Sequence, residues 1–360
     1  MAMILAEGFD AYGVVGGATS PVYDWPVDSK WSHQSVSYGS VVAAIGRRST
    51  PGLRQAYNTS GLGYSWSKCN LGAEYGTLIL GFAFKPLAYA SNTPAYPILQ
   101  FEDAAAAVQV VIHRTAANGL EVRASSAGTL LAASADSVIT TDAYQYVEIK
   151  VVCDSSGSVI IRIDGTEVIN EVGIDTQTAN AGGMQIIHFR AYNSGVSAYS
   201  YIDDLVVMDA TGSTFNDFLG DVQVAGHMPT ADGTHSDWTS TEANHYDAVN
   251  DVGAAFDDDY IESSTESQKD SFSITPSGTA PGILAVEVAG HGLNTGAGTA
   301  KVTPFVIIGG VTYSGSELTL PAGTSGKVSY VWEKNPATAG IWSRAVLAAA
   351  EFGFEVTEIS

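Results

Sequence analysis

Basic residues and cysteines are both scarce in this chain of 360 residues. It contains 16 Lys and Arg against 38 Asp and Glu, a net charge of −22, and no basic run longer than Arg47-Arg48. Nucleic acids and anionic lipid surfaces bind clustered positive charge, so neither is an expected partner. The two cysteines, Cys69 and Cys153, show no spacing pattern. This argues against a disulfide scaffold and favours folding in a reducing cytosol.

Long hydrophobic runs are also absent. No stretch of 18 consecutive apolar residues occurs, so we expect no membrane insertion. The first residues, MAMILAEGFDAY, lack a basic region before their apolar part, so no signal peptide is predicted. The length fits two domains, each large enough to bury its own core.

Short apolar runs that alternate with polar residues fill the first 210 positions. They are bounded by Gly, Pro, Asn, Asp and Ser, which is typical of antiparallel strands joined by turns. A polar stretch follows from about 210 to 240, strand-like runs resume at 270, and residues 341–353 show helical spacing with Gly353 as a C-cap. We therefore predict a β-sandwich over 1–212. A smaller β-sandwich with a long N-terminal connecting loop and one short helix is predicted over 213–360.

Residues 147–169, VEIKVVCDSSGSVIIRIDGTEVI, illustrate the pattern. Both halves present one apolar face, and a loop at 154–156 with Gly157 in the left-handed conformation joins them. This register places Glu148 opposite Arg162, whereas a slip by two residues places two cations together. The hairpin is therefore predicted to be sandwich wall, with no side chain left over for catalysis.

Two blocks of the chain resemble a known family. The first block comprises ILAEGFDAY (4–12), GRRSTPGLRQAY (46–57), RIDGTEV (162–168) and YIDDLVVMD (201–209). It resembles the concanavalin A-like lectin/glucanase jelly roll in its laminin-G-like form. The second block, at 220–251, 257–274 and 339–356, is similar to a C-terminal module that follows such jelly rolls in tailed-bacteriophage virion proteins. The resemblance implies an all-β chain, a jelly-roll sandwich followed by a smaller β-sandwich.

The same resemblance implies a non-enzymatic virion structural protein of the tail, fibre or baseplate apparatus. It would be made in the host cytoplasm and located in the virion. Its expected partners are other virion proteins and copies of itself, a trimer by analogy, with host-surface glycan as a further partner. A glycan-binding adhesin (receptor-binding protein) and a capsid-decorating protein are the alternatives, because a jelly roll does not fix function.

Catalytic motifs of this fold are not found. A retaining glucanase carries paired carboxylates in the pattern E-x-D-x-x-E. The acidic pair Glu102-Asp103 is followed by alanines, and the acidic C-terminal residues 351–360 lack the central Asp. No nucleophile elbow, phosphate loop, dinucleotide-binding glycine pattern or C-x-x-C pair occurs either. No catalytic residue is therefore predicted.

Metal and cofactor sites are not predicted. The acidic clusters Asp203-Asp204 and 257–259 offer oxygens to calcium, but neighbours along a strand point to opposite faces. Solvated edge charges that discourage strand pairing are the favoured interpretation. His227, His235 and His245 show no spacing that matches a metal motif, so we expect surface or loop histidines.

Aromatic residues are the remaining candidates for a binding surface. Five fall in loop-rich N-terminal sequence: Trp25, Trp31, Tyr38, Tyr64 and Trp66. Exposed rings there would stack on sugars, and the same residue types also cap cores and anchor subunit interfaces. The interface interpretation is favoured over glycan binding, and both remain open.

Overall fold

A computed structural model describes most of the chain. The described residues are 3–9, 20–21, 31–33, 39–42, 45–48, 50, 52–56, 65–87, 95–125, 128–178, 183–191, 199–250, 259–277, 282–323 and 325–360. Those up to Val224 form one compact unit, and those from Ala225 to Ser360 form another. Whether these units are the domains predicted at 1–212 and 213–360 stays a prediction.

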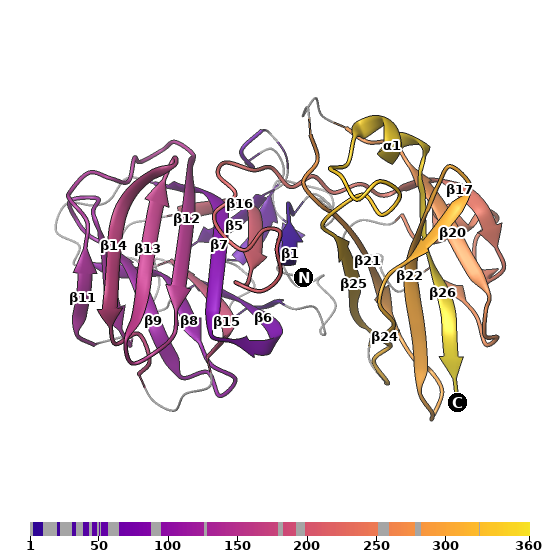
Figure 1. The fold of residues 1–360 in the computed structure, drawn as a ribbon, viewed down its shortest axis with the longest axis horizontal. Coiled ribbons are helices and arrows are strands. Elements are labelled where there is room, and N and C mark those ends of the chain that lie inside the picture. The colour runs from indigo at the N-terminus through magenta and orange to yellow at the C-terminus, as the bar shows by residue number, and fades with distance from the viewer. Residues whose placement is uncertain are drawn as a thin grey trace. The chain divides into compact units, whose positions relative to one another are not determined.

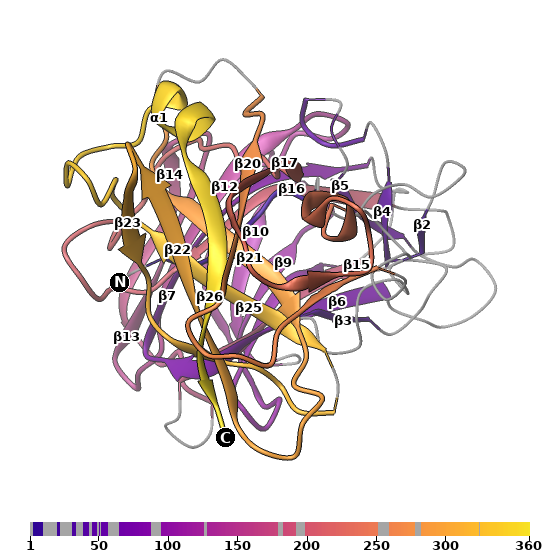
Figure 2. The same cartoon turned by 90° about the vertical axis from the view of Figure 1, so that its right-hand side faces the viewer.

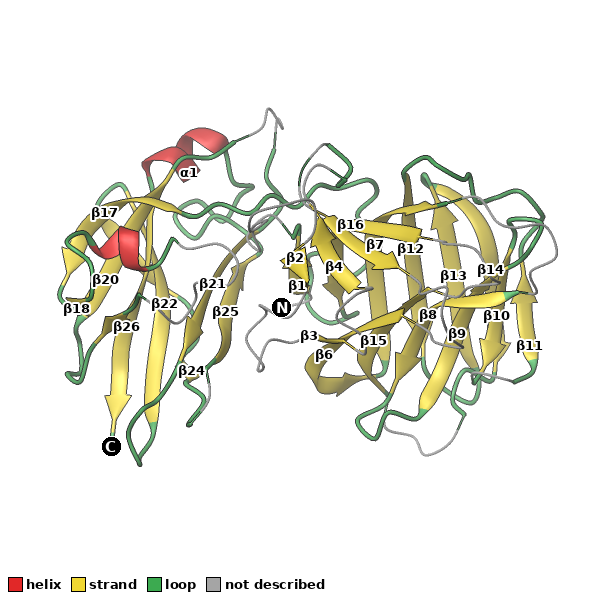
Figure 3. Cartoon of the chain, turned by 180° about the vertical axis from the view of Figure 1, so that it is seen from behind, coloured by secondary structure: helices red, strands yellow, loops and turns green. Residues whose placement is uncertain are grey.

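The N-terminal unit is a sandwich of two antiparallel sheets (Figures 1 and 3). The first sheet has the order β14-β13-β12-β7-β16-β5-β4-β2, with β1 also paired to β16. Its strands are β1 (Met3–Glu7), β2 (Ser20–Pro21), β4 (Gly39–Val42), β5 (Gly52–Ala56), β7 (Thr77–Pro86), β12 (Gln145–Val152), β13 (Gly157–Ile163), β14 (Thr166–Ile174) and β16 (Tyr199–Met208). The pairing of the first and last strands of the sandwich, β1 and β16, closes the unit.

The second sheet has seven strands in the order β11-β10-β9-β8-β15-β6-β3. They are β3 (Trp31–His33), β6 (Ser65–Tyr75), β8 (Tyr96–Glu102), β9 (Val108–Arg114), β10 (Leu120–Ala124), β11 (Leu130–Ala133) and β15 (Met184–Ala191). The ring of Phe189 on β15 meets that of Phe82 on β7 edge-to-face, at 5.3 Å between centroids. Fully burying each such ring contributes roughly 1.5–3 kcal/mol, so this contact marks the core between the sheets.

The predicted hairpin register is confirmed. Glu148 pairs with Arg162 between β12 and β13. The role assigned to Gly157 is wrong, because it lies in β13 and not in a left-handed turn. A Cβ atom there would lie 2.2 Å from Thr176 Oγ1 and from Val152 O, so glycine is needed for close approach. The left-handed residues of this region are Asp164 and Gly165, in the two-residue turn after β13.

Glu148 and Arg162 are each engaged by the segment 217–224, here called the strap. The backbone N–H of Gly220 donates to Glu148 Oε1 at 2.7 Å, and the Arg162 guanidinium lies 4.3 Å from the centroid of the Phe218 ring. At the end of the strap, the N–H of Val224 donates to Asp204 Oδ1. The strap therefore covers the outer side of the first sheet, and Glu148 is buried beneath it.

Burial raises the pKa of Glu148, and the Gly220 hydrogen bond and the charge of Arg162 offset only part of that shift. A carboxyl whose pKa is raised on folding binds its proton more tightly in the folded state. Its contribution to stability is therefore present below the ordinary glutamate pKa and is lost as pH rises through the raised value. We expect Glu148→Gln to remove this loss, because glutamine still accepts from Gly220. Thermal melts of both proteins across this pH window test the expectation, and parallel melting-temperature curves would contradict it.

The C-terminal unit is also built from antiparallel sheets (Figure 2). Its main sheet has the order β17-β20-β26-β22-β23, with β24 also paired to β22, and two smaller sheets are β21-β25 and β18-β19. The strands are β17 (Pro229–Ser236), β18 (Thr239–Ser240), β19 (Ile261–Glu262), β20 (Lys269–Ile274), β21 (Val286–Gly292), β22 (Ala300–Ile308), β23 (Val311–Ser314), β24 (Leu318–Thr319), β25 (Gly326–Trp332) and β26 (Glu351–Ile359). Part of the predicted connecting loop is thus strand, since β17 and β18 lie within it.

One α-helix occurs among the described residues, α1 (Arg344–Ala349), with a 3-10 turn, η3 (His245–Ala248), elsewhere in the unit. The side chain of Ser343 caps α1 by accepting from the N–H of Val346. The all-β prediction with one short helix is therefore confirmed. Gly353 is not its C-cap: it lies within β26, where a Cβ atom would lie 1.9 Å from Asp270 O. No helix in the described part of the chain has the length and apolar character needed to cross a membrane.

Candidate active site on the seven-stranded sheet

The face of the seven-stranded sheet that is turned away from the core carries a set of polar side chains, several of which are buried. Side chains alternate between the two faces of a strand, and Phe101 and Phe189 point into the core. Their neighbours along β8 and β15 therefore lie on the opposite face. The set, here called the polar face, is Lys68, Gln100, Glu102, His113, Glu121, Arg123, His188 and Arg190.

Strand register aligns part of this set in one row across the sheet. His188 on β15 is the direct partner of Gln100 on β8 and of Lys68 on β6. Gln100 is in turn paired with Val111 on β9, and Val111 with Arg123 on β10. Five neighbouring strands thus contribute side chains to a single line.

A hydrogen-bonded group lies at the centre of this face. His188 Nδ1 is 2.5 Å from Glu102 Oε1, and Lys68 Nζ is 2.6 Å from Glu102 Oε2. Glu102 and His188 are both buried, with 2% and 6% of their surface exposed. A buried carboxylate that accepts from an imidazole fixes the ring orientation and its tautomer. The proton therefore lies on Nδ1, which leaves the Nε2 lone pair as the basic site.

The charges of this group follow from burial and hydrogen bonding. Burial alone would raise the pKa of Glu102, but the hydrogen bonds and charges of His188 and Lys68 together outweigh it and lower the pKa. Burial, with the charges of Lys68 and Arg190, lowers the pKa of His188, and Glu102 offsets only part of that shift. At neutral pH the imidazole is therefore neutral, and Lys68 supplies the positive charge that balances Glu102. A neutral, oriented imidazole is the form that acts as a general base.

Arg190 lies two residues along β15 from His188, on the same face. Its Nη1 donates to the side-chain oxygen of Gln100, so the guanidinium is held beside the imidazole. A guanidinium presents five N–H donors in a planar fork, which matches a carboxylate. The polar face carries three cations, Lys68, Arg123 and Arg190, against two carboxylates. This local excess of positive charge occurs in a chain whose net charge is −22.

The aromatic residues predicted from the sequence are only partly placed. Trp31 lies in β3 and Trp66 in β6, where Trp66 is the register partner of Arg190. The backbone of Trp66 is therefore next to the polar face. Trp25, Tyr38 and Tyr64 lie outside the described residues. The choice between a sugar-binding and an interface role for these rings stays open.

The residues of the polar face were missed because they are spread over strands far apart in the sequence. Lys68 and Glu102 are 34 positions apart, and Glu102 and His188 are 86 apart. One local signal was present. The run IIHFRA (186–191) places His188 and Arg190 at alternate positions, so both side chains lie on the face opposite to Phe189.

The acidic pair Asp203-Asp204 is not the solvated edge charge that was predicted. Both residues are 2% exposed. Asp203 accepts from the N–H of Arg47, and Asp204 accepts from Val224 and lies 3.7 Å from the Arg47 guanidinium. They hold the segment around Arg47 and the strap against β16. Within the described residues, no three His, Cys, Asp or Glu side chains form a group suited to a metal ion.

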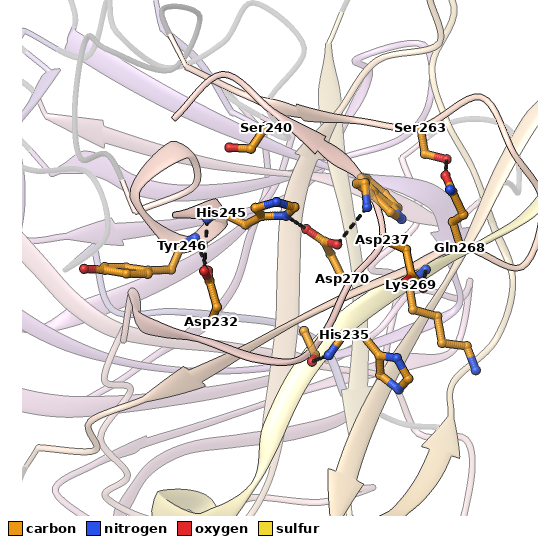
Figure 4. A network of polar contacts seen from close by, with 12 residues as sticks. Asp232, His235, Asp237, Ser240, His245, Tyr246, Ser263, Gln268, Lys269 and Asp270 are labelled. Atoms are coloured by element: carbon orange, nitrogen blue, oxygen red, sulfur yellow. Dashed lines mark hydrogen bonds and ion pairs between the residues drawn. The ribbon is translucent and has the colours of Figure 1, made fainter. Parts of the chain in front are cut away.

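The predicted histidines lie in the C-terminal unit. His245 Nδ1 is 2.5 Å from Asp270 Oδ2, and Asp232 accepts from the backbone N–H groups of His245 and Tyr246 (Figure 4). These contacts fasten η3 to β17 and β20. The His235 ring meets Phe305 edge-to-face at 6.1 Å. Both histidines have structural contacts, and Asp257 and Asp258 lie outside the described residues.

No protein-family model and no curated protein sequence matches the chain. Many solved structures do resemble it. The alginate lyase Aly36B is 15% identical, covers 57% of this chain and 96% of its own, and has a TM-score of 0.40. An endo-beta-1,4-glucuronan lyase from the fungus Trichoderma reesei is 15% identical, with coverages of 57% and 94% and a TM-score of 0.39.

A third similar structure is a conserved carbohydrate esterase from the Shiga toxin-encoding bacteriophage phi24B. It is 12% identical, with coverages of 57% of this chain and 97% of that chain and a TM-score of 0.39. The predicted all-β fold class is confirmed by the strands and sheets of the structure itself. A bacteriophage virion protein is not confirmed by these similarities.

The prediction of a non-enzymatic structural protein, and with it the expectation that the chain is not an enzyme, is corrected by the same comparison. Several of the similar structures are lyases and one is an esterase, and others are a cellulose-induced protein and a botulinum neurotoxin. The physical reason is that paired glycosidase carboxylates are only one of the side-chain groups that cleave polysaccharides. The polar face instead carries an imidazole, a guanidinium and a carboxylate–lysine pair.

Proposed function

We propose that the polar face cleaves a uronate-containing polysaccharide by elimination. His188 is the base and Arg190 binds the carboxylate of the sugar that loses a proton. The observation that carries the proposal is the buried His188–Glu102–Lys68 group with Arg190 and Gln100 beside it on one sheet face.

The chemistry needs two functions at once. A proton on the carbon next to a carboxylate is weakly acidic, and hydrogen bonds to the carboxylate stabilise the charge that develops as the proton leaves. Arg190 supplies such donors. His188 Nε2 takes the C5 proton, the electrons of that bond form a C4–C5 double bond, and the C4–O bond to the next sugar breaks. The departing oxygen receives a proton from the imidazolium, which restores the neutral base, and no water is consumed.

Hydrolysis by two carboxylates fits the face less well. A retaining glycosidase needs its two carboxyl groups about 5 Å apart, one of them ready to attack or to donate a proton. Glu102 is bound by Lys68 and His188, and Glu121 is bound by the Nε and Nη2 donors of Arg123. They lie on β8 and β10, with β9 between them. Neither carboxylate is placed for that chemistry.

Replacing Arg190 with glutamine tests the assigned role. A hydrogen bond to a charged group contributes about 1.5–3 kcal/mol, so kcat/KM should fall by about 10- to 100-fold. Initial rates on alginate and on polyglucuronate, followed by the ultraviolet absorbance of unsaturated product, measure the effect. Arg48→Gln is the matched control, because Arg48 is exposed and the substitution removes the same charge. An equal fall in kcat/KM in both variants would show that the loss comes from the change in net charge and not from the position of Arg190.

The location of such an enzyme, in a virion or elsewhere, remains a prediction from the sequence. The two blocks that resemble tailed-phage proteins support a virion location, where an enzyme that cuts host-surface polysaccharide would act. Contact with other virion proteins and self-association are proposed on the same ground.

A further inference from the structure

Among the described residues, none donates to or accepts from either ring nitrogen of His113 on β9, a member of the polar face. It is 7% exposed, and both nitrogens are buried without a hydrogen bond. The backbone of Ala95 lies near enough to raise its pKa, but the contact falls outside hydrogen-bond geometry. Leaving a buried polar group unsatisfied costs about 1–3 kcal/mol, so such groups in folded proteins need an explanation.

The charged residues around His113 do not supply a partner. Its register partner Glu121 accepts two hydrogen bonds from Arg123, and Arg123 Nη1 donates to the carbonyl of Gly128. Arg190 is held at Gln100. Burial, and then the charge of Arg123, lower the pKa of His113, so its ring is neutral at neutral pH. A neutral imidazole offers one donor and one acceptor.

We infer that His113 forms a second sugar-binding position on the polar face, which holds the neighbouring ring of the substrate through its hydroxyl groups and not through a carboxylate. A hydroxyl both donates and accepts, which matches the two ring nitrogens. A carboxylate only accepts hydrogen bonds, so it would use one of the two ring nitrogens. The nearby cation Arg123 is already bound to the carboxylate of Glu121. This inference rests on the proposed function, because it takes the polar face to be a saccharide site.

The two positions are separated by the width of two strand pairings. His113 is on β9 and Arg190 is on β15, with β8 between them, so their backbones are about 10 Å apart. We assign one sugar ring to each position. The substrate therefore has at least two sugar rings. The carboxylate of one ring binds Arg190, and the hydroxyl groups of the other bind His113. The saccharide chain lies across the strands.

Binding of short saccharides tests the inference without turnover. The probes are glucuronate, diglucuronate, and glucuronate linked to glucose in both orders, with affinities measured by calorimetry. We expect His113→Phe to weaken diglucuronate and at least one mixed disaccharide by about tenfold, the loss of one hydrogen bond, and to leave glucuronate unchanged. Unchanged affinity for all disaccharides, a loss confined to diglucuronate, or no binding by the unaltered protein overturns the inference.

A second measurement on the unaltered protein guards against a variant that does not fold. In protein labelled with carbon-13 histidine, the His113 ring signal should shift when a disaccharide is added and remain in place with glucuronate. Shifts with both sugars, or with neither, contradict the second position. Disaccharide binding at His113 without any cleavage of polymer would remove the proposed enzymatic function and keep the binding site, so the two failures are distinguishable.

Discussion

Replacing His188 with glutamine is expected to lower kcat on a uronate polymer by about 10²- to 10⁴-fold, the usual contribution of a general base. Glutamine is close in size and keeps a hydrogen bond to Glu102, but it has no basic nitrogen to take the proton. Saccharide affinity should change by less than about threefold, because Arg190 and Gln100 remain. Initial rates and calorimetry on the same preparation separate the two effects. His227→Gln, a change of the same kind in the C-terminal unit, is the control.

The pH dependence of the unaltered protein checks the same assignment. The base must be unprotonated, and burial lowers the pKa of His188 from 6.5. The value of kcat/KM should therefore rise with pH through a pKa below 6.5 and then level off. A rise only above neutral pH would mean that another group carries the proton. A variant His188→Gln with full activity would mean that the imidazole is structural.

Replacing Trp342 with alanine is expected to destabilise the C-terminal unit by about 3–5 kcal/mol. Trp342 is 0% exposed, its indole N–H donates to the carbonyl of Trp332, and it packs in a cluster with Val306 and Phe352. Alanine leaves a cavity and an unsatisfied carbonyl. By the usual relation between free energy and melting temperature, the transition of this unit should fall by roughly 10 °C or more.

Scanning calorimetry measures this effect, with the neighbouring residue as a matched control. Ile341 is 71% exposed, so Ile341→Ala should change stability by less than about 0.5 kcal/mol. The polar face lies in the other unit, which has its own core. Activity of Trp342→Ala below its first transition should therefore equal that of the unaltered protein. A single transition that falls as a whole would show that the two units unfold together.

Alternation along the chain was enough to predict the sandwich and the register of Glu148 with Arg162. A side-chain period of two residues is a local property, and like charges in the slipped register excluded the alternative. The roles of the glycines could not be predicted in this way. Gly157 and Gly353 are required because other chain segments approach them closely, and that requirement exists only once the sheets have formed.

The polar face could not be predicted from the sequence for a related reason. His188, Glu102 and Lys68 come from three strands whose neighbourhood is set by sheet order, and no local spacing connects them. A short sequence motif can reveal a site only when one turn or one strand holds it. The absence of paired carboxylates from the sequence argues against one hydrolytic mechanism, and it does not bear on elimination by an imidazole.

Product analysis of a polyglucuronate digest tests the central claim most directly. Elimination leaves each new non-reducing end with a double bond, so those products are lighter by one water than the products of hydrolysis. Mass spectrometry should show the lighter products with the unaltered protein, and their formation should be lost with His188→Gln. Products of hydrolytic mass, or no cleavage of any uronate polymer by the unaltered protein, would contradict the assignment of the polar face as an eliminating active site.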